Sequence, residues 1–214
     1  MNLKQDLILY KPWNEQEQCD KEVMQKLLEE QPDIFYRENR TAHFTASSWL
    51  LNKEHDKVLM IYHNIYHSWA WTGGHADGEE NLLSVAIREA EEETGVTGIV
   101  PVKEDIYSLE ILTVDGHEKR GISDVRPVSE EIFSLESLTV DGHVKKGRYV
   151  SSHLHLNVTY LLEADEQAVL RVKPDENSGV KWFSLEEALE ACSEPWMIER
   201  VYKKLNQKLK GEQR

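Results

Sequence analysis

The stretch that decides the fold reads Gly73-Gly-His-Ala-Asp-Gly-Glu-Glu-Asn-Leu-Leu-Ser-Val-Ala-Ile-Arg-Glu-Ala-Glu-Glu-Glu-Thr-Gly-Val96. On a helix that turns about 100° per residue, Glu89, Glu92 and Glu93 fall within an arc of roughly 100°. The neighbouring stripe is apolar and holds Leu83, Ala86, Ile87, Ala90 and Thr94. The pattern therefore predicts a helix from about Glu80 to Thr94 that buries one side and presents carboxylates on the adjoining one.

These carboxylates repel one another unless something neutralises them. Like charges three or four residues apart destabilise a helix by a few tenths of a kcal/mol per pair. Hard divalent cations remove this repulsion, and ligands that are all oxygen favour Mg²⁺ or Mn²⁺ over zinc. The alternative for an isolated run of glutamates is a solvated acidic face. Gly95, which follows the predicted helix, is a typical C-terminal cap.

Composition limits the function classes. The chain has 214 residues, with 25 Lys and Arg against 39 Asp and Glu, and so a formal net charge of −14. This describes one soluble globular domain, with room for an appendage. The negative excess disfavours binding to nucleic acid through a broad electrostatic patch. An anionic substrate would need a divalent cation between it and the acidic side chains.

The sequence has no recognisable membrane span or secretion signal, and its two cysteines suggest no disulfide or zinc site. The longest uninterrupted apolar run, Val58 to Tyr62, is too short to span a membrane, and the amino terminus does not read as a secretion signal. Cys19 and Cys192 are far apart, so neither a disulfide framework nor a zinc cage is supported. We therefore expect a cytoplasmic protein.

Residues 1–40 are expected to form an amino-terminal helical extension, because residues 16–30 carry apolar side chains at helical spacing. The main domain is expected to span residues 41–214. Its first elements are two short aromatic and aliphatic runs, His43–Leu51 and Lys57–His63, which predict a β-hairpin.

The carboxy-terminal half predicts further strands and helices. Alternation over Tyr149–Glu163 predicts a strand whose apolar face carries Leu154, Leu156, Val158, Tyr160 and Leu162, with His153, His155, Asn157 and Thr159 on the other face. Lys181–Phe183 reads as a short strand. Ser184 and Glu187 form a capping box for a helix over 185–191, and 194–210 is a final helix.

One segment occurs twice. Asp105–Gly121 returns 26 residues later as Glu131–Gly147, within a tandem duplication of residues 97–121 and 123–147. One position in a sheet accepts only one of two similar strands. Because the second copy runs into the strand from Tyr149 through an Asp-Gly turn, we expect it to fill the native hairpin. The first copy is then an added excursion or an extra edge strand.

Read from Gly74, the segment has Gly, five residues, Glu80, seven residues, Arg88-Glu89, Ala90, one residue, Glu92-Glu93, one residue, Gly95 and Val96. This pattern strongly resembles the Nudix box, the signature of hydrolases that cleave nucleoside diphosphates linked to another moiety. Its seven fixed identities would recur by chance in such a chain on the order of once in 10⁵. Only Ala90 departs from the pattern, since it is smaller than the usual Ile, Leu or Val.

The resemblance implies an α/β fold, a Nudix α/β/α sandwich with a mixed, mainly antiparallel sheet. It also implies site residues. The implied metal ligands are Glu89, Glu92, Glu93, a peripheral or structural Glu80, and the backbone carbonyl of Gly73. Arg88 matches the arginine that orients carboxylates in this family. The implied cofactor is Mg²⁺ or Mn²⁺, which would screen the diphosphate and acidify a bound water.

The general base is sought outside the box. Nudix enzymes often use a loop glutamate ahead of the strand that ends in Trp-Phe, and here that loop offers Glu176 and Asp175. A solvated loop is the alternative for both residues. Our set of catalytic residues is Glu92, Glu93, Arg88 and Glu176.

Histidines and aromatic residues are weaker candidates. His153 and His155 could line the cleft or bind metal, with an exposed strand face as the favoured alternative, and His75 could contact a phosphate. Tyr66, Trp69 and Trp71 could stack on a base, although aromatic residues in short strands more often belong to the core.

We expect a metal-dependent hydrolase acting on a small, nucleotide-derived diphosphate. The amino-terminal helix and an added strand could serve a homodimer. One rival is an enzyme like isopentenyl-diphosphate isomerase, which the run from His43 and the later Gly-Gly-His also resemble. The position of its catalytic cysteine is taken by Gly73 and Gly74. A second rival is a non-catalytic diphosphate-binding regulator, which would be expected to have lost a box carboxylate.

Overall fold

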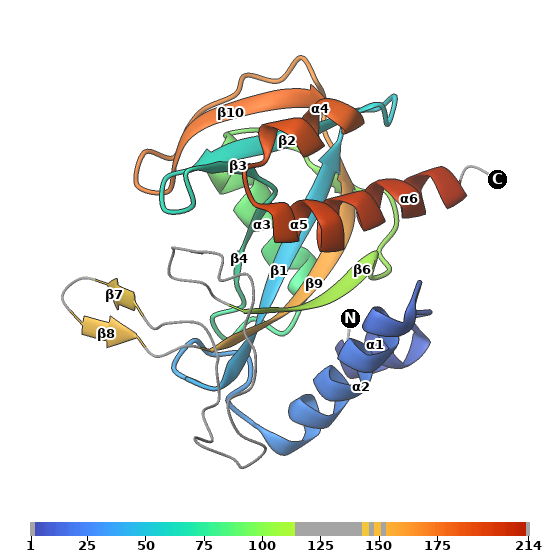
Figure 1. Ribbon diagram of the computed structural model, residues 1–214, viewed down its shortest axis with the longest axis vertical. Coiled ribbons are helices and arrows are strands. Elements are labelled where there is room, and N and C mark those ends of the chain that lie inside the picture. The colour runs from blue at the N-terminus through green and yellow to red at the C-terminus, as the bar shows by residue number, and fades with distance from the viewer. Residues whose placement is uncertain (1–2, 114–142, 146–147, 151–152, 213–214) are drawn as a thin grey trace, which may run out of the picture.

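A computed structural model of the chain describes residues 3–113, 143–145, 148–150 and 153–212 (Figure 1). Its centre is an eight-stranded sheet in which the longest path runs β10-β2-β1-β9-β5. The strands are β1 (Ala42–Leu51), β2 (Lys57–His63), β3 (Ser68–Ala70), β4 (Thr72–His75), β5 (Val100–Pro101), β6 (Ser108–Thr113), β9 (Leu154–Glu163) and β10 (Asn177–Ser184). Strand β1 pairs with β9 in parallel and with β2 and β4 in antiparallel fashion, and β3, β5, β6 and β10 add further antiparallel pairs. The expected mixed, mainly antiparallel sheet is confirmed.

Helices cover both faces of this sheet (Figure 1). Helix α3 (Leu82–Thr94) packs on one face in a core cluster that includes Phe44 and Val158. The opposite face is covered by α4 (Leu185–Ala191), α5 (Pro195–Met197), the π-helical turn η1 (Ile198–Tyr202) and α6 (Lys203–Glu212), around a second cluster that includes Trp49. This is the expected α/β/α sandwich. Within the described ranges, no helix is long and apolar enough to cross a membrane.

Several local predictions are confirmed. The hairpin of β1 and β2 forms, α3 ends at Gly95 with φ of +70°, and Ser184 caps α4 in a capping box with Glu187. The helix expected over 194–210 is divided into α5, η1 and α6, because a π-helical turn interrupts it. The strand expected from Tyr149 is also divided, since β8 (Arg148–Val150) pairs with β7 (His143–Lys145) in a separate two-stranded sheet.

The expectation that the second copy takes the position in the main sheet is wrong for the described residues, whereas the first copy does form an edge strand. The strand of the first copy, β6, lies in the main sheet and pairs with β9 from Ser108 opposite Thr159 to Thr113 opposite Leu154. Most of the second copy, including its Asp-Gly turn, lies outside the described residues. The part that is described, β7, pairs with β8 rather than with the main sheet.

Two sequence differences between the copies explain this choice. Ile111 packs against the core cluster that contains Leu109, whereas the second copy has Ser137 at the equivalent position. The Tyr107 hydroxyl donates a hydrogen bond of 2.8 Å to the backbone oxygen of Leu205, and the second copy has Phe133 there, which cannot donate. Placing the second copy in this position would lose both apolar burial and a buried hydrogen bond.

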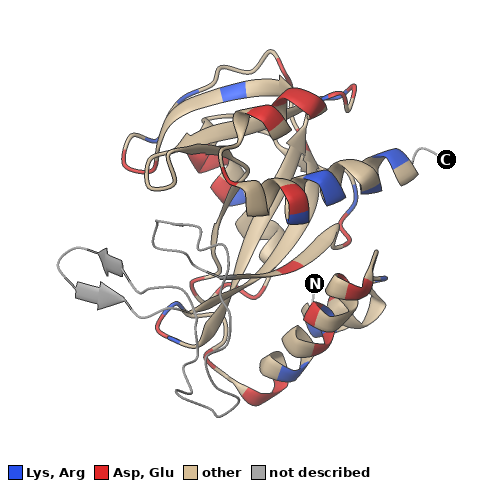
Figure 2. Cartoon of the chain, viewed as in Figure 1, with Lys and Arg blue, Asp and Glu red and all other residues tan. Residues whose placement is uncertain are grey.

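The amino-terminal helices are α1 (Leu3–Leu9), which packs through Leu3 and Leu7 on the first core cluster, and α2 (Glu15–Glu30), which is joined to α6 and β6 through a buried ionic group. The fully buried Glu17 on α2 lies 2.6 Å from Lys208 and 3.0 Å from Lys204, both on α6, whose basic residues are seen in Figure 2. Lys204 also lies 3.0 Å from Glu110 on β6. Burial opposes the charge of Glu17, but the two ammonium groups outweigh this effect and lower its pKa to about 2. The extension therefore packs on the rest of the chain through charged as well as apolar contacts.

Candidate active site

Two glycines bring β4 directly against β1 and α3. A Cβ added at Gly73 would lie 2.6 Å from the backbone oxygen of Ala46 on β1, and one added at Gly74 would lie 2.5 Å from the carboxyl carbon of Glu89 on α3. A larger residue at Gly73 would push β4 away from the β1 backbone, and one at Gly74 would displace the Glu89 carboxylate. Gly73 and Gly74 lie within a strand and have no positive φ, so close packing and not backbone conformation accounts for the two glycines.

Glu93 is the most buried carboxylate of the predicted set. Its side chain sits at the end of α3, is 3% exposed, and accepts a hydrogen bond of 3.0 Å from the backbone N–H of Gly73. Burial raises the pKa of Glu93 to about 8, and the nearby Glu89 and Glu176 add to this rise, although the Gly73 N–H opposes it. With this pKa, the metal-free Glu93 is largely protonated at neutral pH, and a bound cation would favour its ionised form.

Glu89 lies beside Glu93 on the same side of the helix. It packs under Gly74, and its Oε1 accepts a hydrogen bond of 2.9 Å from the Arg88 guanidinium. Arg88 Nε also lies 3.9 Å from Oε1 of Glu92. The arginine thus contacts two of the three carboxylates that the sequence predicted as ligands.

Glu92 and Glu176 come together across the chain. Lys173 Nζ lies 3.1 Å from Oε2 of Glu92 and 3.0 Å from Oε2 of Glu176, so one ammonium group bridges the helix and the loop. Burial lowers the pKa of Lys173, but the two carboxylates outweigh this effect and the net shift is upward. The loop is held over the helix end by Asn177, whose amide donates a hydrogen bond of 3.0 Å to the backbone oxygen of Glu93.

The structure therefore gathers Glu89, Glu92, Glu93 and Glu176 around the end of α3 and β4. Glu80 is not part of this group. It precedes α3, is exposed, and lines a pocket of about 230 Å³ with Leu3 and Phe35. Asp175 is exposed in the loop.

The aromatic candidates behave as packing residues. Trp69 and Trp71 pack against the second core cluster, and the Trp71 backbone N–H donates a hydrogen bond to the Tyr202 hydroxyl. Tyr66 stacks on His63 with ring centroids 4.2 Å apart. For Trp69 and Trp71 the interpretation as core residues agrees with these contacts, whereas Tyr66 lies in the turn between β2 and β3. The two cysteines lie away from the Gly73–Gly74 pair in sequence, Cys19 on α2 and Cys192 at the end of α4.

The histidines are less exposed than the favoured interpretation held. His153 is only 9% exposed and His155 is half-buried, because both face His43 on the neighbouring strand β1. His75 on β4 lies beside them, with its ring centroid 5.1 Å from that of His43 and 5.0 Å from that of His155. The expectation of an exposed strand face at His153 and His155 is therefore wrong.

Sequence reasoning missed Lys173 and Asn177. Their contacts with Glu92 and Glu93 join residues separated by 81 and 84 positions, respectively. The motif carries no information about such contacts. The only local signal was the position of both residues in the loop that had already been considered for Glu176.

The arrangement can hold a hard cation. Glu93 contacts the Gly73 backbone and Glu89 packs under Gly74, while Glu92 and Glu176 share the ammonium group of Lys173. Comparison with known proteins agrees: a NUDIX domain is matched over residues 41–205. The chain belongs to the Nudix family. Membership assigns it to the Nudix pyrophosphohydrolases.

Solved structures of similar shape include Nudix-type proteins. A C. elegans Ap4A hydrolase binary complex has 18% identity and a TM-score of 0.48, and the match covers 79% of this chain and 96% of that one. A MutT protein from Methanosarcina mazei Go1 has 15% identity and a TM-score of 0.49, with 80% and 98% covered. A NUDIX-family hydrolase from Clostridium perfringens has 20% identity and a TM-score of 0.42, with 77% and 97% covered. The search of curated proteins finds no significant match.

Proposed function

We propose that this Nudix protein is a metal-dependent hydrolase that cleaves the diphosphate linkage of a nucleoside diphosphate joined to another moiety, by attack of water on phosphorus. The observation that carries the proposal is the contact of Glu93 and Glu89 with the Gly73–Gly74 segment, with Glu92 on the same helix linked through Lys173 to Glu176 of a distant loop. A regulator that had lost catalysis would not be expected to keep all of these groups.

The proposed ligands are Glu89, Glu92, Glu93 and the backbone carbonyl of Gly73. Their oxygens suit Mg²⁺ or Mn²⁺, and the raised pKa of Glu93 fits a site whose charge is balanced only when a cation binds. When bound, the metal would screen the diphosphate, polarise a phosphoryl oxygen and acidify a coordinated water. We propose that Glu80, which precedes α3, has a structural or peripheral role.

The chain's own groups have distinct proposed roles. Arg88 orients Glu89 and Glu92 through its guanidinium group, which donates to one and lies near the other. Glu176 accepts the proton of the attacking water at a carboxylate oxygen. It is the half-buried carboxylate of this loop, and its charge contributes to the raised pKa of Glu93. Lys173 holds Glu176 beside Glu92 and so keeps the base at the end of α3.

A substrate panel tests the proposal. Nucleoside triphosphates, dinucleotides, nucleotide sugars and non-nucleotide diphosphates are each incubated with Mg²⁺ or Mn²⁺, and phosphate or nucleotide release is measured. We expect metal-dependent release from at least one nucleotide-derived compound, with heavy oxygen from labelled water appearing on a phosphate of the product. Turnover that is unaffected by a chelator, or heavy oxygen on carbon, would contradict the proposal. Size-exclusion chromatography of the same preparation tests the proposed homodimer.

A further inference from the structure

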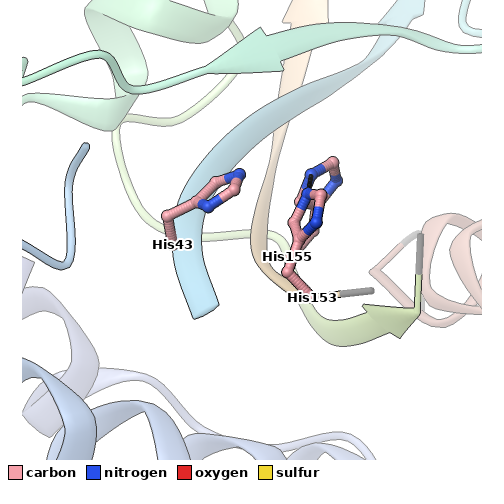
Figure 3. A group of neighbouring side chains, drawn as sticks. All are labelled: His43, His153 and His155. Carbon is pink, nitrogen blue, oxygen red and sulfur yellow. Dashed lines mark hydrogen bonds between the residues drawn. The ribbon is translucent and has the colours of Figure 1, made fainter. Parts of the chain in front are cut away.

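A second cluster of ligand-type side chains lies on the sheet, separate from the carboxylates. His43 on β1 and His155 on β9 are directly opposite each other in the parallel pairing of these strands, and His153 immediately precedes β9. One ring nitrogen from each of the three lies within 4.8 Å of the other two. Figure 3 shows the ring of His43 facing the overlapping rings of His153 and His155.

This cluster is on the face of the sheet opposite α3. Phe44 on β1 and Leu156 on β9 belong to the core cluster that contains α3. Side chains alternate between the two faces of a strand, so His43 and His155 point the other way. The three imidazoles thus lie on the face of the sheet opposite α3, the helix that carries the three carboxylates.

The hydrogen bonding of His43 leaves one of its ring nitrogens available to bind a metal ion. Its ring is 2% exposed, and its Nδ1 lies 3.1 Å from the backbone oxygen of Asn39. Because a carbonyl oxygen can only accept, Nδ1 must carry the proton, which leaves the lone pair of the neutral ring on Nε2. That Nε2 is buried and has no hydrogen-bond partner in the part of the chain that the structure describes. A histidine that donates one N–H to a carbonyl and directs its other nitrogen to a metal is a common arrangement in metal sites.

The other two rings have a matching geometry. Nε2 of His153 and Nε2 of His155 are 3.3 Å apart. Two nitrogens that bind one tetrahedral zinc ion, each at about 2.0–2.1 Å, stand about 3.4 Å apart. Burial lowers the pKa of His155 well below its usual value, with neighbouring histidines adding to the effect, and burial also lowers the pKa of His43. Neutral imidazoles are the form that binds metal.

We propose that His43, His153 and His155 bind a divalent transition-metal ion of the zinc class, with the fourth position of the tetrahedron facing His75. Nitrogen ligands select zinc, cobalt, nickel or copper over Mg²⁺, so this ion is distinct from the one proposed at the carboxylates. It would join β1 to β9 on the face opposite α3. Because His75 follows Gly74 directly on β4, the ion also lies beside the strand that carries the Gly73 carbonyl.

The test uses the full-length protein after removal of metal with a chelator. Zn²⁺ is titrated in competition with a chromophoric chelator, in a large excess of Mg²⁺, and Co²⁺ is added separately to record its visible absorption. We expect one tight equivalent of Zn²⁺ that Mg²⁺ does not displace, an intense tetrahedral Co²⁺ spectrum, and a higher midpoint of thermal unfolding with Zn²⁺.

Variants locate the ion. His43→Gln and His155→Gln should each weaken Zn²⁺ binding by roughly 10²-fold or more, since loss of groups that only support ligands already costs about 10- to 100-fold. His63→Gln, which changes a histidine outside the cluster, and Glu89→Gln, which changes the carboxylates, should keep the tight equivalent. Circular dichroism checks the fold, and if a cluster variant does not fold, the wild-type Co²⁺ spectrum decides. Absence of a tight equivalent, an octahedral Co²⁺ spectrum, or folded cluster variants that bind like wild type would overturn the proposal.

Discussion

Ionisation of Glu93 should destabilise the metal-free protein, and Glu93→Gln should remove this effect. The pKa of Glu93 is about 8 in the folded chain, against an ordinary value of 4.5. Between these two values the folded state therefore holds more protons than the unfolded state, and the free energy of unfolding falls as pH rises through this window. The slope is about 1.4 kcal/mol per pH unit.

This slope sets the size of the effect. In the metal-free protein we expect the free energy of unfolding to be lower by on the order of 3 kcal/mol at pH 7 than it would be with a neutral side chain. Glutamine is neutral at all pH values and its carbonyl oxygen can still accept the Gly73 N–H. Glu93→Gln should therefore be more stable than wild type at pH 7 and lack the slope, while hydrolysis is abolished.

Urea unfolding between pH 5 and 9, in the presence of a chelator, measures the prediction. Glu91→Gln is the matched control, because it makes the same change on the same helix at a half-buried carboxylate that accepts a hydrogen bond from Gly98. The control should keep the wild-type slope. If Glu93→Gln shows the same pH dependence as wild type, the burial of this carboxyl group is not what raises its pKa and the reasoning is refuted.

Two further predictions concern the loop and the duplication. Glu176→Gln should lower turnover by roughly 10²- to 10⁴-fold, with little change in the Mg²⁺ concentration that gives the half-maximal rate, since a general base acts on the proton and not on the metal. Asp175→Asn is the control. A loss of turnover below tenfold in Glu176→Gln would show that Glu176 is only a solvated loop residue. Deletion of residues 114–139 joins Thr113 to Val140 and leaves β6 in place, so circular dichroism and activity should stay near wild type because loop-length changes cost about 0.6 kcal/mol per doubling. Deletion of residues 99–120 removes β6 and should unfold the chain, and a folded, active product would show that the second copy can replace the first.

The sequence predicted those helices and faces that depend on residues close together in the chain. The carboxylate spacing and Gly95 defined α3, Ser184 and Glu187 defined the start of α4, and alternation placed His155 and Leu156 on opposite faces. These features depend on residues within one or two turns of each other.

Long-range packing explains the rest. Ile111 and Tyr107 distinguish the first copy from the second only once the core and the Leu205 carbonyl are in place, so the sequence could not choose between them. The same holds for His43 and His155, which meet only because β1 and β9 pair in one register, and for Lys173, which reaches Glu92 through a folded loop.

The central claim is that the carboxylates of α3 bind the metal that hydrolysis needs, and Glu92 tests it most directly because it is exposed enough to change without disturbing the core. The measurement is the rate of hydrolysis of the best substrate of the panel as a function of Mg²⁺ concentration, for wild type, Glu92→Gln and Glu91→Gln, with circular dichroism to confirm the fold. The account predicts that Glu92→Gln loses metal-dependent hydrolysis while Glu91→Gln stays near wild type. Near wild-type turnover of Glu92→Gln at saturating Mg²⁺ would contradict it.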